Sequence, residues 1–171
     1  MASAVSERLA AVERDYAGEA ERPLGGYLAL LAGYGGLVAG LAGAIRRSGR
    51  ELPAAPALGD LALAAVATHK LARLIAKDSV LSPLRAPFTR YAGVSGEAEL
   101  AEEVRGHGLK KAVGELVTCP FCLGQWVATL FWGGLVLAPR PTRLLAAVFA
   151  TLAGSDVLQL AYARAEQLAT A

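Results

Sequence analysis

The chain of 171 residues has room for one compact unit, which excludes two domains of ordinary size. Hydrophobic residues make up 54 % of the chain and charged residues 19 %, and the mean hydropathy of +0.41 is higher than a typical water-soluble domain has. The formal charge of +2 argues against a nucleic-acid-binding protein, because no basic run is interleaved with aromatic residues.

The first two predicted elements are an amphipathic helix and an apolar helix. Residues 1–23 are charged and polar, lack the pattern of a signal peptide, and predict an amphipathic helix that ends at Pro23. Residues 24–45 carry no charge, and about 20 apolar residues are enough to cross a bilayer. Small residues on one face let helices approach closely in lipid, so this helix is a candidate homo-oligomer surface. Those residues are Gly26, Gly33, Gly36 and Gly40.

The next segment is apolar but carries charges. Residues 57–76 predict a helix that spans the membrane or lies partly at its interface. Its polar side chains are Asp60, His69, Lys70 and Arg73. Residues 78–115 follow as the one extended polar region, and the run SGEAELAEEVRGHG within it predicts a short acidic surface helix.

Two further apolar helices are predicted over residues 116–138 and 144–163, the second interrupted by Asp156. The fold class is therefore all-α, an integral membrane bundle of about four transmembrane helices. The expected organisation is an amphipathic helix over 1–23, a membrane domain over 24–164 with the polar loop 78–115, and a tail over 165–171.

Four crossings place both termini and the 78–115 loop on the same side of the membrane. That side carries 12 of the 17 Lys and Arg residues, so the positive-inside rule predicts that it is cytoplasmic. The opposite side carries the other five, which are Arg46, Arg47, Arg50, Arg140 and Arg143.

A polar cluster is expected inside the bundle. The second and fourth helices run the same way, and His69 and Asp156 each lie 12 residues into their helix, about 18 Å from the same surface. Charges in hydrocarbon are costly unless they are paired, so Asp156 should find a partner in Arg73, Lys70 or His69. The cluster is a structural ion pair, a proton or ion relay, or a polar ligand site.

The run TCPFCLGQW contains both cysteines of the chain. Pro120 suits the first turn of a helix, which places Cys119 at a helix N-terminus and favours its thiolate. Cys119 and Cys122 are interpreted as structural thiols, as a redox pair, or as metal ligands with His69 and His107. Membrane thiol oxidases of the four-helix type use a second cysteine pair, which this chain lacks. The spacing demands no zinc site, so neither a metal nor a cofactor is predicted.

Three blocks resemble a bacterial family of membrane proteins of unknown function that has a sporulation-linked member. They are THKLARLIAKDSVLSPLRAPFTRY, GEAELAEEVRGHGLKKAVGELVTCPFCLGQWVA and LAGSDVLQLAYA, within residues 57–163. The resemblance implies a multi-pass protein of the bacterial plasma membrane. It supplies no catalytic residue.

The leading functional hypothesis is a non-enzymatic scaffold or partner-binding subunit. Its expected partners are the lipid bilayer and a protein that binds the 78–115 loop. The candidate binding residues of this loop are Arg85, Arg90 and Tyr91. One alternative is a membrane thiol–disulfide oxidoreductase in which Cys119 attacks and Cys122 resolves. Another is ion or proton translocation through the cluster of His69, Lys70, Arg73 and Asp156.

Overall fold

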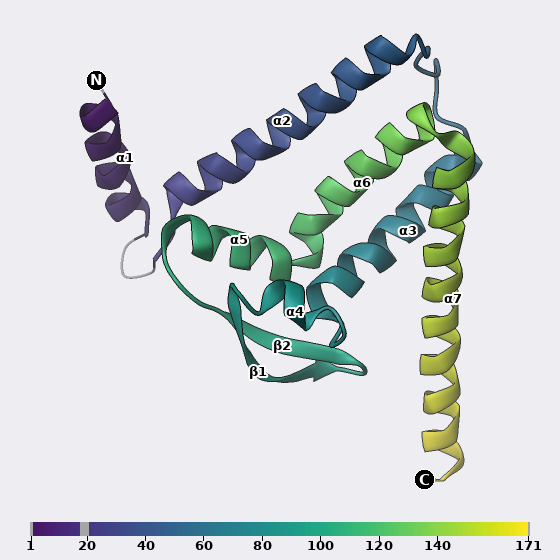
Figure 1. Cartoon of the computed structure of the whole chain (residues 1–171). Coiled ribbons are helices and arrows are strands. Elements are labelled where there is room, and N and C mark those ends of the chain that lie inside the picture. The colour runs from purple at the N-terminus through teal and green to yellow at the C-terminus, as the bar shows by residue number, and fades with distance from the viewer. Residues whose placement is uncertain (1, 18–20, 171) are drawn as a thin grey trace. The chain divides into compact units, whose positions relative to one another are not determined.

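The computed structural model describes residues 2–17 and 21–170, which form helices and one β-hairpin (Figure 1). The helix expected over residues 1–23 is seen as α1, and residues 1 and 18–20 of that range lie outside the described residues. In chain order the elements are α1 (Ala2–Ala17), α2 (Leu24–Ser48), α3 (Leu58–Lys77), α4 (Ser82–Arg85), β1 (Thr89–Gly96), β2 (Glu99–Val104), α5 (Gly108–Thr118), α6 (Pro120–Leu137) and α7 (Pro139–Ala169).

The acidic run that was expected to form a surface helix forms a β-hairpin. β1 and β2 pair antiparallel in a two-stranded sheet, with Thr89 opposite Val104. Leu100, Glu102 and Val104 share one face of β2, as alternate residues of a strand do. Ala98 has a φ of 59° in the two-residue turn, and this left-handed backbone closes the hairpin. The expectation of an all-α fold is therefore wrong for this segment.

The apolar helix expected over residues 116–138 begins instead at Pro120, and residues 116–118 are the last residues of α5. Pro120 has no N–H to donate to the carbonyl of Leu116, and a residue before proline disfavours the helical conformation. Cys119 accordingly adopts φ −105° and ψ 105°, which ends α5, and α6 starts at Pro120. The expected position of Cys119 at a helix N-terminus is confirmed.

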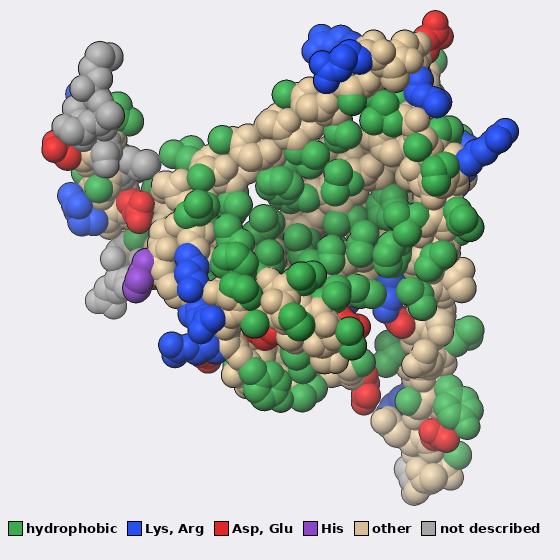
Figure 2. Space-filling model, viewed as in Figure 1, with side chains coloured by type: hydrophobic (Ala, Val, Ile, Leu, Met, Phe, Trp, Pro, Cys, Tyr) green, Lys and Arg blue, Asp and Glu red, His purple; other side chains and the backbone are tan. Residues whose placement is uncertain are grey.

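Among the described residues, three helices are long and apolar enough to cross a membrane: α2, α6 and α7. α3 is not among them, since its sequence includes several charged side chains. α2, α6 and α7 each expose large hydrophobic side chains, for example Leu31, Leu130 and Leu158 respectively. Figure 2 shows hydrophobic side chains over much of the visible surface of the helices, and Lys and Arg at one end of α2.

The contacts divide the chain into two compact units, each described here by itself. The first combines Met1–Val38 with Ala76–Cys119, and the second combines Ala39–Ile75 with Pro120–Ala171. In the first unit, α5 lies close to the start of α2 and to the hairpin. A Cβ atom added to Gly26 would lie 2.8 Å from the Cβ of Ala112, and one added to Gly114 would lie 2.6 Å from a methyl of Val104. Only glycine permits these two close approaches.

The second unit has its core between α3, α6 and α7. Ala64 and Ala67 of α3, Val127 and Phe131 of α6 and Ala146 of α7 are buried together. Alanine side chains on α3 and α7 let the helices pack closely around the larger residues of α6. The second half of α2 approaches α6, since a Cβ on Gly133 would lie 2.8 Å from a methyl of Leu41.

The glycines on the exposed part of α2 contrast with these packed ones. A Cβ added to Gly35, Gly36 or Gly40 would meet no atom of the described residues within 4 Å. A second copy of the chain on this face stays a prediction.

We expect Gly114→Ala to lower the stability of the protein in detergent by about 1–3 kcal/mol. The new methyl would lie 3.0 Å from the backbone oxygen of Phe88, which cannot rotate away as the side chain of Val104 can. Gly36→Ala is the matched control, because its methyl has space and alanine favours a helix by about 1 kcal/mol over glycine. Thermal unfolding of both variants tests this, and equal midpoints would contradict the close packing of α5.

Candidate functional site

Two ion pairs join α3 and α7 in the second unit. Lys70 Nζ donates to Asp156 Oδ2 at 2.5 Å. Arg143 donates from Nε and Nη2 to the two carboxylate oxygens of Asp60, each at 2.7 Å. On α3 Asp60 precedes Lys70, whereas on α7 Arg143 precedes Asp156. If the two helices ran in opposite directions, the two aspartates would face each other and so would the two cations. The order of charges therefore selects the parallel arrangement.

The four residues of the predicted polar cluster all lie in this unit. Asp156 pairs with Lys70, one of its three expected partners, and these side chains are 47 % and 20 % exposed. His69 and Arg73 are exposed and line a pocket together. The structure thus separates an ion pair between α3 and α7 from a pair of basic side chains beside α6. Translocation through His69 and Asp156 stays a prediction.

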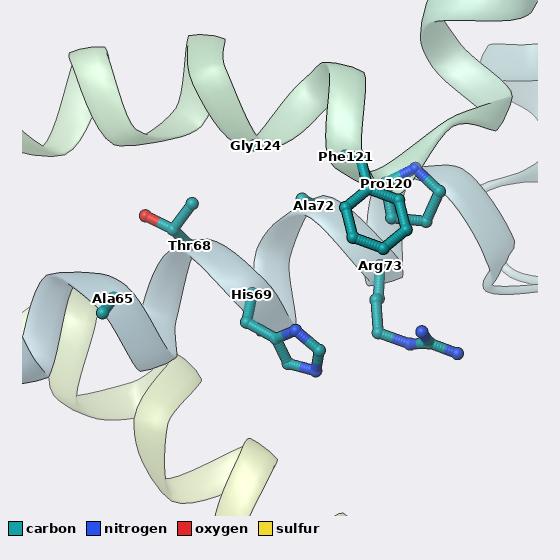
Figure 3. Close-up of a pocket in the computed structure, with 8 residues that line it drawn as sticks. All are labelled: Ala65, Thr68, His69, Ala72, Arg73, Pro120, Phe121 and Gly124. Carbon is teal, nitrogen blue, oxygen red and sulfur yellow. The ribbon is translucent and has the colours of Figure 1, made fainter.

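The pocket is a groove between α3 and the start of α6, with a volume of about 280 Å³. On α3, Ala65, His69 and Arg73 succeed one another at intervals of four residues, so they share one face. On α6, Phe121 and Gly124 line the groove. Figure 3 shows His69 and Arg73 extending from the same side of α3, with the Phe121 ring near Arg73. Sequence reasoning missed the two α6 residues, because no residue pattern in a single helix shows which neighbour it faces.

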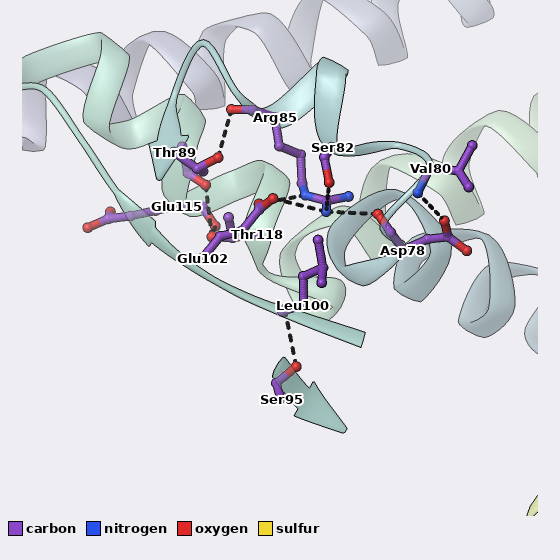
Figure 4. A network of polar contacts seen from close by, with 11 residues as sticks. Asp78, Val80, Ser82, Arg85, Thr89, Ser95, Leu100, Glu102, Glu115 and Thr118 are labelled. Carbon is purple, nitrogen blue, oxygen red and sulfur yellow. Dashed lines mark hydrogen bonds and ion pairs between the residues drawn. The ribbon is translucent and has the colours of Figure 1, made fainter. Parts of the chain in front are cut away.

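A second polar network holds together residues 78–118, which we call the insert module and which contains α4, β1, β2 and α5 (Figure 4). Arg85 Nε donates to Glu102 at 2.7 Å and Arg85 Nη2 donates to the other carboxylate oxygen at 3.1 Å. The same Nη2 donates to the backbone oxygen of Asp78 at 2.8 Å. The side chains of Arg85 and Glu102 are 0 % and 6 % exposed, so this pair is almost wholly removed from solvent.

The three predicted binding residues of the loop therefore differ in position. Arg85 is fully buried and joins α4 to β2, which is a structural position. Arg90 and Tyr91 are exposed on β1, and Tyr91 is 68 % exposed. Sequence reasoning missed Glu102, the partner of Arg85. The signal was its place between Leu100 and Val104, since alternate residues of a strand share a face and a single acid among apolar residues there needs a partner. The prediction of partner binding now concerns Arg90 and Tyr91.

The two cysteines lie at the start of α6, and His107 lies just before α5. Cys119 is partly buried between α5 and α6, and Cys122 is exposed in the first turn of α6. His107 Nδ1 lies 2.9 Å from the carboxylate of Glu21, and this hydrogen bond lowers the pKa of Glu21. Within residues 2–17 and 21–170, no three His, Cys, Asp or Glu side chains are grouped so that they could hold a metal ion. The redox role of the cysteine pair stays a prediction.

The comparisons with known proteins bear on the region that holds both networks. A family model described as "Protein of unknown function (DUF1360)" matches residues 63–162, which is more than half of the chain. The chain belongs to this family. The DUF1360 region starts within α3 and ends within α7, so it includes Lys70, Asp156 and the whole insert module. The expected family resemblance is confirmed.

One curated relative of this DUF1360 chain is the sporulation protein YjcA of Bacillus subtilis (strain 168). The two sequences are 32 % identical over 71 residues, which is 40 % of this chain and 60 % of the relative. The match therefore leaves a substantial part of each protein uncovered. No solved structure matches the chain.

We expect Lys70 and Asp156 to be energetically coupled by about 1–3 kcal/mol. Lys70→Met or Asp156→Leu leaves one charge without its partner among apolar helices, whereas the double variant removes both charges. Each single variant should lower the thermal unfolding midpoint in detergent, and the double variant should lose less than the sum of the two.

The control for this cycle is Arg164→Met, which removes an exposed charge from α7 two turns beyond Asp156 and should change stability by less than about 0.5 kcal/mol. Additive effects of the two single variants would show that the pair does not stabilise the packing of α3 on α7.

Proposed function

We propose that this protein is a non-enzymatic membrane subunit that binds a protein partner through its insert module. The observation that carries the proposal is the buried Arg85–Glu102 pair. This pair supports the view that residues 78–118 form a folded segment and not a loose loop. Both charges are removed from solvent, and losing one partner of a buried ion pair typically costs about 3–5 kcal/mol. Such a segment is built to present a defined shape.

The surface that the module offers is the outer strand of the hairpin. β2 contacts α5, and β1 carries exposed Arg90, Tyr91 and Val94. Tyrosine and arginine are enriched among the residues that dominate binding energy in protein interfaces. β1 has register irregularities near Gly93 and Gly96, and such irregularities blunt unselective pairing of an edge strand. A specific protein partner fits this surface better than aggregation through the edge.

We infer that four helices cross the bilayer: α2, α3, α6 and α7. The length and composition of α2, α6 and α7 support three crossings. α3 is more polar, but its Asp60 and Lys70 are each paired with a residue of α7. Since one pair holds α3 alongside α7 at the start of both helices and the other holds them near their middle, a bilayer that contains α7 also contains α3. Pairing reduces the cost of charges in hydrocarbon.

The side of the module follows from the four crossings and the distribution of positive charge. Of the 12 Lys and Arg residues counted for the side of the module and both termini, Lys70 and Arg73 lie inside α3, and the other ten still exceed the five on the opposite side, which places the module in the bacterial cytoplasm. The sporulation protein of Bacillus subtilis suggests a cellular process for the family, without identifying the partner.

The topology is tested by cysteine labelling in a variant whose Cys119 and Cys122 are replaced by serine. We expect a membrane-impermeant maleimide to label Arg50→Cys and Arg140→Cys in intact cells, and to label Gly96→Cys only after the cells are permeabilised. Labelling of Gly96→Cys and Arg50→Cys from the same side would contradict a crossing by α3.

Partner binding is tested by site-specific photo-cross-linking from position 91 in the full-length chain. We expect a discrete protein adduct from a photoreactive residue at Tyr91, and its loss on Arg90→Ala, which changes the surface. Arg85→Met should also abolish the adduct, because it leaves Glu102 buried without its cation and unfolds the module.

The control places the same photoreactive residue at Leu28, which is exposed on α2 and outside the module. Amide hydrogen exchange of the hairpin separates the two effects, since it should rise in Arg85→Met and stay unchanged in Arg90→Ala. An adduct that persists in both variants would exclude the module as the binding surface.

A further inference from the structure

The groove between α3 and α6 has the composition of a site for an anionic amphiphile. Its lining contains two basic side chains, Arg73 and His69, and no carboxylate. Every other lining residue except Thr68 is apolar or glycine. An anion therefore meets donors at one part of the groove, while an attached hydrocarbon chain meets an apolar wall.

The start of α6 adds to the positive character of the groove. Pro120 is the first residue of the helix, and the following N–H groups of the first turn have no acceptor within the helix. The helix dipole also places partial positive charge at this end. Pro120 and Phe121 line the groove, so the end of the helix lies beside Arg73 and His69 rather than apart from them.

The size and exposure of the groove indicate which part of such a molecule it holds. Its volume of about 280 Å³ is close to the lower limit of ligand pockets, roughly 300 Å³. That volume suits a phosphate headgroup and the beginning of a chain, and not a whole lipid. Phe121 is 92 % exposed in the first turn of α6, so its apolar ring is open to a hydrocarbon chain.

We propose that this groove binds the phosphate headgroup of an anionic phospholipid. Arg73 and His69 donate to the phosphate oxygens, and the Phe121 ring lies against the first part of an acyl chain. The proposal rests on the membrane placement given under Proposed function, but not on the protein partner of the insert module. A free phosphate ion would use the same donors, but it would leave the apolar wall without a role.

Two variants remove the two halves of the site. Arg73→Gln removes a charge, and Gly124→Leu fills the groove. A Cβ on Gly124 would meet only the methyl of Thr68 at 4.0 Å, an ordinary contact, so the position has space for a side chain, and Gly124 lines the groove that the side chain would fill. Leucine also favours a helix over glycine. Arg140→Gln is the matched control, because it removes the same charge from the first turn of α7, outside the groove lining.

Native mass spectrometry of the full chain in detergent measures the binding of dioctanoyl phosphatidylglycerol. We expect both groove variants to bind it about tenfold or more weakly than the natural chain, while Arg140→Gln binds it unchanged. Dioctanoyl phosphatidylcholine, with the same chains and no net charge, should bind more weakly to the natural chain. Unchanged affinity in Arg73→Gln and Gly124→Leu would overturn the proposal.

Competition with inorganic phosphate distinguishes the two sources of the anion. We expect phosphate to leave the bound phosphatidylglycerol in place at equal concentration, and displacement would overturn the assignment to a lipid. The thermal midpoint of Gly124→Leu should not fall, which shows that lost binding is not lost folding. If phosphatidylglycerol binding fails while the photo-cross-link from position 91 persists, only the groove proposal is overturned. If only the photo-cross-link is lost, the proposed partner surface is overturned.

Discussion

The Lys70–Asp156 ion pair is the interaction on which the second unit depends. It joins α3 to α7 across 86 positions of the sequence, and the Asp60–Arg143 pair joins the same helices near their first residues. The order of charges permits only a parallel arrangement of the two helices. With α3 held in this way, Lys70 is directed to α7, and the face that carries His69 and Arg73 is left open beside α6.

The insert module is also held together by an ion pair. Arg85 and Glu102 are buried in a small polar segment that has little hydrocarbon of its own to bury. The fork of the guanidinium satisfies both carboxylate oxygens and the Asp78 carbonyl, so few polar atoms are left without a partner. The strand that carries Tyr91 is thereby attached to a rigid support. A loop of the same composition without that pair would present its aromatic side chain in many orientations.

Sequence reasoning found the features that depend on composition and spacing, and missed those that depend on distant residues. The apolar helices follow from composition, the parallel course of α3 and α7 follows from the number of helices between them, and Lys70 was one of three expected partners of Asp156. Residues 99–104 consist largely of good helix formers, and they form a strand because Glu102 meets Arg85 and the hairpin meets α5. The groove needed both helices in place, because Phe121 and Gly124 read as ordinary residues of an apolar helix.

In the proposed four-helix topology, the long separation between Lys70 and Asp156 has a consequence for how the protein is made. During synthesis Lys70 leaves the ribosome well before its carboxylate partner, and α3 then lacks the neutralising charge that suits it to hydrocarbon. The earlier helix therefore reaches its final place only when the last one has emerged. In the proposed four-helix topology, biogenesis of this protein therefore ends with a docking step, in which α7 brings the counter-charge that holds α3 in the membrane.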